Sequence, residues 1–416
     1  MPGGRPRDVA VVGAGMVGLA TAWFLQEGGA AVTVYERDRV GAGASWGNAG
    51  WLTPALAAPL PEPAVLRYGL TAVLDPSSPV YLPLRADPRL LRFLVSFARN
   101  STHRRWRRGM AALVPLDERA LDAFDALAAG GVTARTPRSE PFLAVYRSER
   151  QREGLLAELR GVREAGQRDV RFSLVSGAEA RSMEPVLTAE AGSAIRISGQ
   201  RYLDPPAFLA SLAASVRARG GAVAEGHGVT GIADTGDGVV VGTGAGEQRH
   251  DAVVVATGAW LGTLARRFGV RQPVQAGRGY SFSVPVRRMP GGPLYFPVER
   301  VACTPLGDRL RIAGMMEFRR PDDALDPRRI DAIVAAVRPF LSDVDLDDRQ
   351  DEWVGSRPVT VDGLPLLGAT ASPRAFLAGG HGMWGIALGP VTGRLLARAV
   401  LDGEAPPELR PFDPLR

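Results

Sequence analysis

The feature that most constrains this chain is a glycine-rich turn near the N-terminus, which joins an apolar strand to a helix. The strand is predicted over Val9–Val12, and the turn carries glycines in the G-x-G-x-x-G spacing: Gly13, Gly15 and Gly18. The first glycine permits the tight turn, the second lets a pyrophosphate approach the backbone, and the third lets the helix pack closely on the sheet. The free N–H groups at the start of the helix favour a bound anion.

A second β-type run, Ala31–Tyr35, ends at Glu36. This acid lies about 20 residues beyond the central glycine, where a carboxylate can accept hydrogen bonds from ribose hydroxyls. An acid in this place suits an unphosphorylated ribose and therefore disfavours NADP. The pattern predicts a Rossmann-like dinucleotide-binding unit, but the motif alone does not choose between FAD and NAD.

The length and charge of the chain set its broad class. A chain of 416 residues is too long for one simple core, so we expect two interleaved domains. The net charge is +6 and the chain contains no lysine, so its positive charge is arginine. The arginines are scattered, apart from the cluster Arg104–Arg108, and scattered charge usually marks a solvated surface. We therefore expect no nucleic-acid partner. The cluster is expected to be either a solvated helix end or a contact with acidic lipid headgroups.

Cysteine content and hydropathy bear on compartment and metal binding. The one cysteine, Cys303, excludes an intrachain disulfide framework and a cysteine-based metal cluster, and we expect no metal. Residues 1–8 are polar and do not resemble a secretory signal. No apolar run reaches the roughly 18 residues of a membrane span. We therefore expect a cytoplasmic protein, with peripheral contact at the inner face of the membrane left open.

Two further segments that contain glycine could bring the backbone close to a ligand. The loop Gly41–Gly50 can bring backbone N–H groups against a ligand, with Ser45 and Asn48 as its polar side chains. The buried run Ala252–Val255 ends in Thr257-Gly258, a second point of close approach for a cofactor.

The rest of the chain divides by hydrophobic period into helices and short strands. Helices are predicted over Leu19–Leu25, Leu90–Phe97, Arg108–Ala129, Ser148–Glu164, Ala207–Arg219, Asp326–Phe340 and Pro390–Leu401. A mostly antiparallel sheet is predicted from Gln275–Val284, Leu294–Phe296, Val301–Thr304 and Leu310–Gly314.

The sequence around these motifs resembles a known family. The stretch from Gly13 through Glu36 to Asn48-Ala49-Gly50 resembles the FAD-dependent D-amino acid dehydrogenases and the glycine and D-amino acid oxidases, the DAO family. The C-terminal blocks Trp353–Gly368 and Ala378–Gly385 resemble the C-terminal flavin-binding region of the same family. The resemblance covers almost the whole chain and is most specific at residues 9–54 and 353–396.

The resemblance implies an α/β fold, in which a Rossmann-like FAD-binding domain is interleaved with an α+β substrate domain built on a mostly antiparallel sheet. Residues 1–55, 176–262 and 341–416 are expected to form the FAD-binding domain, and residues 56–175 and 263–340 the substrate domain.

The resemblance also implies FAD as the cofactor. Family members with covalent flavin use a cysteine, and Cys303 lies outside the C-terminal flavin segment, so the FAD is expected to be noncovalent. The residues expected to bind it are Gly13, Gly15, Met16, Gly18, Glu36, Arg37, Ala44, Ser45, Asn48, Ala49, Gly50, Trp51, Val229, Thr257, Gly258, Trp260, Gly355, Gly380, His381, Gly382, Met383 and Gly385.

The reaction that the resemblance implies is the oxidative deamination of an amino acid, with a D-amino acid favoured. Hydride leaves the α carbon for flavin N5, and the resulting imine hydrolyses to a 2-oxo acid. Arg357 occupies the family position for the substrate carboxylate, which a planar guanidinium matches in a bidentate manner. The alternative is a structural arginine paired with an acid such as Asp362.

Each of two other side chains has two possible roles. Tyr280 either hydrogen-bonds the substrate and lines the pocket, or packs in a half-buried strand. His381 either places a positive charge near the reduced flavin or is a hydrogen-bonded structural histidine.

One departure from the family pattern bears on the substrate. Glycine oxidases carry a second carboxylate-binding arginine in the G-H-x-x-x-G segment, whereas this chain has Met383 beside Trp384. This favours a bulkier, apolar or cyclic amino acid, and leaves open an amine without a carboxylate.

The electron acceptor divides the possible functions. The first hypothesis is a dehydrogenase that passes electrons to a quinone or another carrier. The second is an oxidase that uses O2 and acts on a secondary, cyclic or modified amino acid or amine in a biosynthetic pathway. A nicotinamide-dependent dehydrogenase and a flavoprotein without catalytic activity are disfavoured, by Asn48–Gly50 and by Arg357 respectively.

Overall fold

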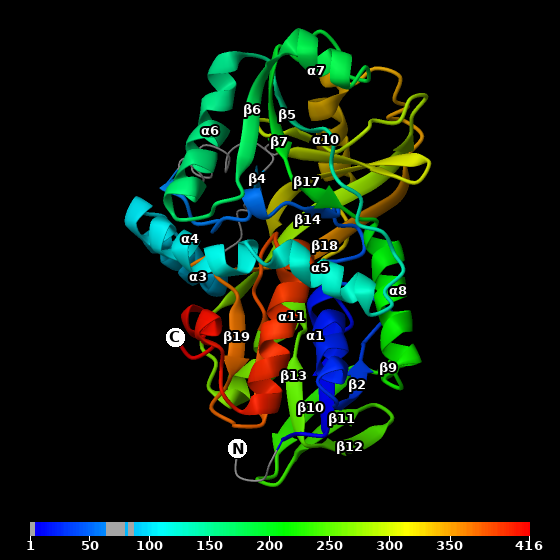
Figure 1. Cartoon of the computed structure of the whole chain (residues 1–416). Coiled ribbons are helices and arrows are strands. Elements are labelled where there is room, and N and C mark those ends of the chain that lie inside the picture. The colour runs from blue at the N-terminus through cyan, green and yellow to red at the C-terminus, as the bar shows by residue number, and fades with distance from the viewer. Residues whose placement is uncertain (1–4, 64–79, 82–86) are drawn as a thin grey trace.

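The protein has two interleaved units, each built on its own sheet. The computed structural model describes residues 5–63, 80–81 and 87–416. In Figure 1 a six-stranded sheet with long helices occupies the lower half and a nine-stranded sheet occupies the upper half. The predicted α/β class, with parallel and antiparallel sheets in one chain, is confirmed.

The six-stranded sheet is parallel except at one edge, where β19 runs antiparallel to β20. Its strands in spatial order are β19 (Leu366–Ala369), β20 (Ala375–Gly379), β13 (Ala252–Val255), β1 (Asp8–Val12), β2 (Ala31–Tyr35) and β9 (Ala222–Ala224). In β1, Val9 and Val11 face one hydrophobic core while Ala10 and Val12 face another. A strand that is buried on both faces is a continuous apolar run, which explains why β1 was predictable.

Each face of this sheet is covered by a different layer. One face carries the helices α1 (Met16–Glu27), α8 (Pro205–Ala218) and α11 (Gly385–Asp402). The other face carries an antiparallel sheet of β10 (Val229–Asp234), β11 (Val239–Thr243) and β12 (Gly246–His250).

Glycines allow the closest contacts in the helical layer. A Cβ on Gly18 of α1 would lie 1.9 Å from the carbonyl oxygen of Gly13. A Cβ on Gly393 of α11 would lie 2.7 Å from the backbone nitrogen of Thr21 in α1. The first contact sets α1 against the turn that leaves β1, and the second sets α11 against α1.

The nine-stranded sheet is mostly antiparallel, as predicted. Among the described strands of this sheet, only the pairs β15–β5 and β17–β4 are parallel. Its strands in spatial order are β18 (Gln350–Thr360), β14 (Val274–Pro285), β17 (Arg309–Phe318), β16 (Val301–Leu306), β15 (Leu294–Phe296), β5 (Phe142–Tyr146), β7 (Ser193–Ser198) and β6 (Arg171–Ser176), with β4 (Val80–Tyr81) beside β17. A short ladder of β3 (Trp51–Leu52) and β8 (Arg201–Tyr202) lies apart from both large sheets.

The remaining described helices surround the nine-stranded sheet or join the two units. They are α3 (Pro88–Asn100), α4 (His103–Asp117), α5 (Ala120–Ala129), α6 (Glu149–Glu164), α7 (Gly177–Met183), α9 (Leu261–Ala265) and α10 (Pro327–Val337). Several begin at a side-chain cap, as their sequences suggest. The Ser176 hydroxyl accepts from the Glu179 backbone N–H at 3.2 Å, and the Glu179 carboxylate accepts from the Ser176 backbone N–H at 2.7 Å, a complete capping box.

Two helix predictions need correction. The helix expected over Arg108–Ala129 is two helices, α4 and α5, which meet at Glu118-Arg119. α4 also begins earlier than expected, because the Thr102 hydroxyl caps it by accepting from the Arg105 N–H at 3.3 Å. The arginine cluster therefore lies within the first turns of α4 and not between two helices.

The last helix also begins earlier than predicted. α11 starts at Gly385 rather than Pro390, and Pro390 lies inside it. Proline is favoured in a first turn, but it is tolerated deeper in a helix when packing holds the helix together, and Pro390 is buried. The helix N-terminus therefore lies five positions closer to the Gly380–Met383 segment than the sequence indicated.

Some strands were not predicted, and they bear on domain organisation. β6 and β12 are mostly exposed along their length, so they lack the apolar alternation that marks a strand. Ser193–Ser198 and Gln350–Thr360, expected in the FAD-binding domain, hydrogen-bond within the nine-stranded sheet. The expected domain ranges stay a prediction.

The described residues contain neither a candidate membrane-spanning helix nor a candidate metal-ligand cluster. Across residues 5–63, 80–81 and 87–416, no helix combines the length and apolar character that a membrane span requires. The same residues contain no group of three or more His, Cys, Asp or Glu side chains placed to hold a metal ion.

The contact at Gly18 gives a stability prediction. We expect Gly18→Ala to lower the free energy of unfolding by about 2–3 kcal/mol, because the added methyl overlaps the Gly13 carbonyl and must push α1 away from the turn. Gly262→Ala in α9 is the matched control, since a Cβ there meets nothing within 4 Å. Urea denaturation should show a control that is unchanged or up to about 1 kcal/mol more stable. Equal destabilisation of both variants would contradict this account of Gly18.

Candidate active site

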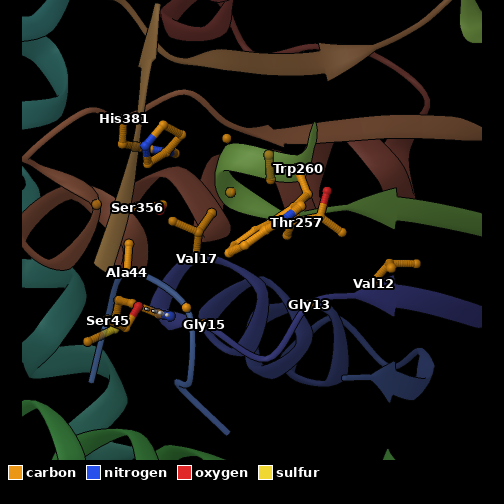
Figure 2. A pocket seen from close by; sticks show the side chains of 18 of the residues that line it. Val12, Gly13, Gly15, Val17, Ala44, Ser45, Thr257, Trp260, Ser356 and His381 are labelled. Atoms are coloured by element: carbon orange, nitrogen blue, oxygen red, sulfur yellow. Dashed lines mark hydrogen bonds between the residues drawn. The ribbon is translucent and has the colours of Figure 1, made fainter. Parts of the chain in front are cut away.

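A pocket lies where the carboxyl ends of β1, β2 and β13 meet the nine-stranded sheet (Figure 2). Ligands of open α/β sheets bind at this edge, outside the carboxyl ends of the parallel strands. The turn after β1, the start of α1, the Gly43–Asn48 loop and the segment after β13 form one side. Residues 356–358 of β18 and the segment leading into α11 form the other.

Most of the predicted cofactor residues come together in this pocket. Those in its wall are Gly13, Gly15, Met16, Glu36, Arg37, Ala44, Ser45, Asn48, Val229, Thr257, Gly258, Trp260, His381, Gly382, Met383 and Gly385. Arg357 lines the same pocket. Residues as far apart in the chain as Gly13 and Gly385 thus meet at one site, which the motifs alone could not show.

The other predicted cofactor residues lie behind the wall. They are Gly18, Ala49, Gly50, Trp51, Gly355 and Gly380, none of which is in the lining. Their glycines serve close packing instead. A Cβ on Gly50 would lie 2.0 Å from the Leu203 carbonyl oxygen, and a Cβ on Gly355 would lie 1.8 Å from the Trp353 ring.

Trp51 fastens the cofactor loop to the large sheet. Its indole N–H donates to the Thr304 hydroxyl at 2.9 Å, and that hydroxyl donates to the Ala49 carbonyl at 2.7 Å. The Trp51 ring also packs edge-on against Phe142 and Tyr295. Ala49 and Trp51 therefore fix the loop in place and are not themselves in the pocket wall.

Sequence reasoning missed part of the lining. The additional residues are Val12, Val17, Tyr35, Asp38, Gly43, Gly228, Ala256, Thr263, Leu264, Ser356, Pro358, Ala378, Gly379 and Ile386. Most of them adjoin a recognised motif residue, so the signal was proximity in sequence. Thr263 and Leu264 gave no such signal, because they reach the pocket only through the turn into α9.

The nucleotide end of the pocket has ordered acceptors and donors. One Glu36 oxygen accepts from the Ala14 N–H at 2.8 Å and the other from the Asp38 N–H at 3.0 Å. The Ser45 hydroxyl accepts from the Met16 N–H at 3.2 Å, as Figure 2 shows. The carboxylate of Glu36 is held in one orientation and keeps lone pairs for further hydrogen bonds.

His381 is held as a neutral side chain. Its Nε2 lies 3.2 Å from the Thr392 hydroxyl, and that hydroxyl donates to the Gly389 carbonyl at 3.0 Å. Nε2 therefore carries the proton, and Nδ1 is a buried acceptor without a partner among the described residues. Burial lowers the pKa of His381 to about 4. This geometry favours the hydrogen-bonded structural histidine over a positive charge at the cofactor.

Arg357 is a half-buried cation in the pocket wall. Its Nη1 donates to the Met315 carbonyl at 2.7 Å. In the part of the chain that the structure describes, no carboxylate lies within ion-pair distance of it. Burial lowers the pKa of Arg357 to about 10, so the guanidinium keeps its charge at neutral pH. The alternative partner, Asp362, is instead paired with Arg416 at 2.9 Å.

A β-bulge prepares the place that Arg357 occupies. Between β14 and β17, Met315 and Met316 stand opposite the single residue Gly279. Met315 has φ +67°, a left-handed conformation that is uncommon outside glycine, and this turn presents its carbonyl to Arg357. A Cβ on Gly279 would lie 2.1 Å from the Arg357 guanidinium. The bulge and the glycine together give the arginine its position.

Tyr280 lies on the opposite side of the sheet from the pocket. Its hydroxyl donates to Glu317 at 2.6 Å, and the same Glu317 oxygen accepts from Arg278 at 3.3 Å. Its ring belongs to the hydrophobic core under the nine-stranded sheet and is not in the pocket lining. The sequence prediction that Tyr280 lines the pocket does not agree with this placement, because β14 alternates faces and Gly279 faces the pocket side.

The chain was compared with families and proteins of known sequence and structure. Residues 8–399 match the model of the DAO family, described as FAD dependent oxidoreductase. A D-amino acid dehydrogenase from Rhizorhabdus wittichii is 30% identical over 409 residues, covering 96% of this chain and 97% of that protein. Another from Methylobacterium radiotolerans is 31% identical, covering 96% of each.

A solved structure shares the fold over the full length. The glycine oxidase from Geobacillus kaustophilus has a TM-score of 0.73 and 24% sequence identity, and the match covers 99% of each chain. The family resemblance and the fold inferred from the motifs are both confirmed.

The pocket also fits FAD on its own geometry. The Thr257 hydroxyl is buried in the wall without a partner among the described residues. The first-turn N–H groups of α1 and α11 have no intrahelical acceptor, and both helix starts line the pocket. A Cβ on Gly258 or Gly382 would meet nothing within 4 Å, so the backbone there is open to a bound molecule. These groups suit the phosphates and the polar ring edge of FAD.

The buried His381 gives a pH prediction. A histidine in the unfolded chain has a pKa near 6.5, whereas burial lowers that of His381 to about 4. Between these values the unfolded chain binds a proton that the native protein does not, so stability falls as the pH drops from 7. At pH 5 we expect His381 alone to cost about 2 kcal/mol of the free energy of unfolding.

Urea denaturation of the wild type and of His381→Asn at pH 7 and pH 5 measures this contribution. The variant should lose less stability than the wild type on acidification. Parallel pH profiles of the wild type and the variant would show that the pKa of His381 in the native protein is close to that in the unfolded chain, and would contradict this account.

Proposed function

The chain belongs to the DAO family of FAD-dependent oxidoreductases, and we propose that it oxidises a free amino acid, preferentially a D-amino acid, at the Cα–N bond. The observation that carries the proposal is Arg357, a half-buried guanidinium in the wall of the cofactor pocket with no carboxylate partner among the described residues. A substrate carboxylate would supply that partner. The relatives named D-amino acid dehydrogenase, which match over nearly the whole chain, support the choice of substrate class.

The chemistry needs little from protein acids and bases. Bound FAD supplies a two-electron acceptor for the Cα–H bond of the neutral amine. The product imine then takes up water and releases a 2-oxo acid and ammonia. Arg357 binds and orients the carboxylate, while the surrounding apolar wall excludes water. Glu36, Ser45 and the two helix starts hold the nucleotide part of the cofactor.

The cofactor is bound without a covalent link in this proposal. Cys303 lies fully buried in β16 and is not in the pocket lining. Burial raises the pKa of its thiol well above the ordinary value, which disfavours the reactive thiolate.

The far end of the pocket is apolar, which bears on the substrate side chain. Met383 lines the pocket and packs against a hydrophobic cluster that contains Met316, Val359 and Phe93. No second cation stands where Met383 lies, so a bulky apolar or cyclic side chain fits better than glycine. The same observation favours a second candidate, the oxidation of a secondary or cyclic amino acid with O2 as acceptor.

The acceptor and location follow from the first candidate. A dehydrogenase of this kind passes its electrons to a quinone or another carrier. We place the protein in the cytoplasm, with peripheral contact at the inner face of the membrane where a membrane quinone is the acceptor.

An anaerobic spectral titration tests the substrate class. We expect D-amino acids with apolar side chains to bleach the flavin band of the purified protein, and NADH to leave it unchanged. L-, N-methyl and cyclic amino acids are titrated in parallel, and bleaching by cyclic or N-methyl compounds alone would replace the first candidate by the second. Admitting air then distinguishes a dehydrogenase, which stays reduced, from an oxidase. A yellow protein that no amino acid bleaches would refute the proposal.

Substitution of Arg357 tests the carboxylate site. We expect Arg357→Met to lower kcat/KM for the best amino acid about 100-fold, mainly through KM, because a charge-assisted hydrogen bond is worth about 3 kcal/mol. The kcat/KM for the corresponding amine, which lacks the carboxylate, should change little in this variant. Arg416→Met is the matched control, since that arginine pairs with Asp362 outside the pocket lining. Steady-state kinetics with unchanged KM in Arg357→Met would exclude Arg357 as the carboxylate ligand.

A further inference from the structure

The helices α3 and α4 carry an unusual concentration of positive charge. Between Asp87 and Asp117 the sequence contains no acidic residue. It contains Arg89, Arg92, Arg99, Arg104, Arg105, Arg107 and Arg108 over the same stretch. The two acids that flank this stretch differ in exposure, since Asp87 is half-buried and Asp117 is buried. The Asp87 carboxylate caps α3, and Asp117 is buried, where burial raises its pKa well above the ordinary value.

All seven arginines are exposed, and two large apolar side chains lie among them. Leu91 is 64% exposed and Val95 is 43% exposed. In the helical period of α3, Val95 shares its outer side with Arg92 and Arg99, while Leu90, Phe93 and Phe97 face the core. We call the outer surface formed by these arginines, Leu91 and Val95 the α3–α4 face.

The charges of this face are not neutralised by neighbours in the described part of the chain. None of its seven arginines forms a salt bridge there, and Arg105 instead donates to the Asn100 side chain at 2.7 Å. Glu62, half-buried, interacts with His103 at the start of α4. Elsewhere the arginines alternate with acids, as in α6, where Arg152 pairs with Glu149 at 3.3 Å.

We propose that the α3–α4 face docks on an anionic lipid membrane. Arginines bind lipid phosphates through bidentate hydrogen bonds, and an apolar residue on the same helix face enters the interfacial zone. A surface with seven cations, no acid and two exposed aliphatic side chains has the charge and the apolar content of such a contact. This inference rests on the proposed function in one respect, namely that a membrane quinone accepts the electrons.

The inner side of α3 connects this face to the active site. Leu90, Phe93 and Phe97 pack in the cluster that includes Met316 and, at its edge, Met383. Met383 lines the cofactor pocket. The apolar end of the pocket therefore lies behind α3, with only this packed cluster between the pocket and the α3–α4 face.

Vesicle binding tests the proposal with the full-length flavoprotein. We expect cosedimentation with vesicles of phosphatidylcholine containing about one quarter phosphatidylglycerol, and none with phosphatidylcholine alone. The binding should weaken steeply between low and physiological salt. Replacement of Arg104, Arg105, Arg107 and Arg108 by glutamine should reduce the partition coefficient about 600-fold, since each of the four cations near an anionic surface contributes about a factor of five.

A charge-matched variant controls for net charge. Replacement of Arg150, Arg160, Arg287 and Arg288 by glutamine also takes the net charge from +6 to +2, but these exposed arginines lie elsewhere. This control should bind vesicles like the wild type. Leu91→Ser with Val95→Ser should weaken binding at high salt more than at low salt, because only the apolar part survives screening.

Three outcomes would overturn the proposal. They are a wild type that does not bind the anionic vesicles at low salt, a control that loses as much binding as the α4 variant, and tight binding of duplex DNA without vesicle binding. Amino-acid bleaching of the flavin is measured without lipid and should be the same in all variants. Failure of docking and failure of the proposed reaction are therefore separate results.

Discussion

The structure depends on one close contact, the turn at Gly13. Gly13 has φ +109°, and its N–H donates to the Tyr35 carbonyl at 2.8 Å. A Cβ there would lie 2.6 Å from the Ala256 carbonyl oxygen. The ends of β1, β2 and β13 therefore meet with no side chain between them. This contact brings Glu36, Thr257 and the start of α1 to one edge of the sheet, where each faces the same pocket.

A set of tryptophans fixes the distance between this edge and the large sheet. Trp353 of β18 lies so close to the cofactor loop that a Cβ on Gly47 would be 2.2 Å from its ring. Trp260 donates to Asp322, in the segment after β17, at 3.0 Å, and Arg37 lies 4.5 Å above the Trp260 ring. With Trp51 bound to Thr304, these contacts join both ends of the pocket to the sheet that carries Arg357. The cofactor and the carboxylate site are thus held by one rigid set of aromatic contacts.

The fold and the nucleotide end of the site were predictable because their signals are local. The Gly13 turn, the acid after β2 and the apolar run of β13 each follow from backbone geometry over a few residues. The position of Tyr280 was not predictable from the strand alone, because the bulge at Met315 and the close glycines of β14 decide which face meets the pocket. Long-range register, which a single sequence does not encode locally, accounts for this difference. The early start of α4 has a local cause instead, since the Thr102 cap outweighs the polar arginine run.

Arg357 lowers the stability of the protein, because its guanidinium is partly desolvated without a counterion. This cost is an argument that the arginine binds a ligand. A half-buried guanidinium that lacks a counterion loses part of its hydration, which one carbonyl bond to Met315 does not fully replace. The lowered pKa expresses the same cost. Elsewhere in the described chain the sheet treats a buried arginine differently: Arg278 lies 3.3 Å from the Glu317 carboxylate on the far face. The strained Met315 and the bare Gly279 keep Arg357 pointed into the pocket, where a carboxylate would offset the desolvation. Under the proposed function, the chain gives up some stability at Arg357, and a bound substrate carboxylate would restore it.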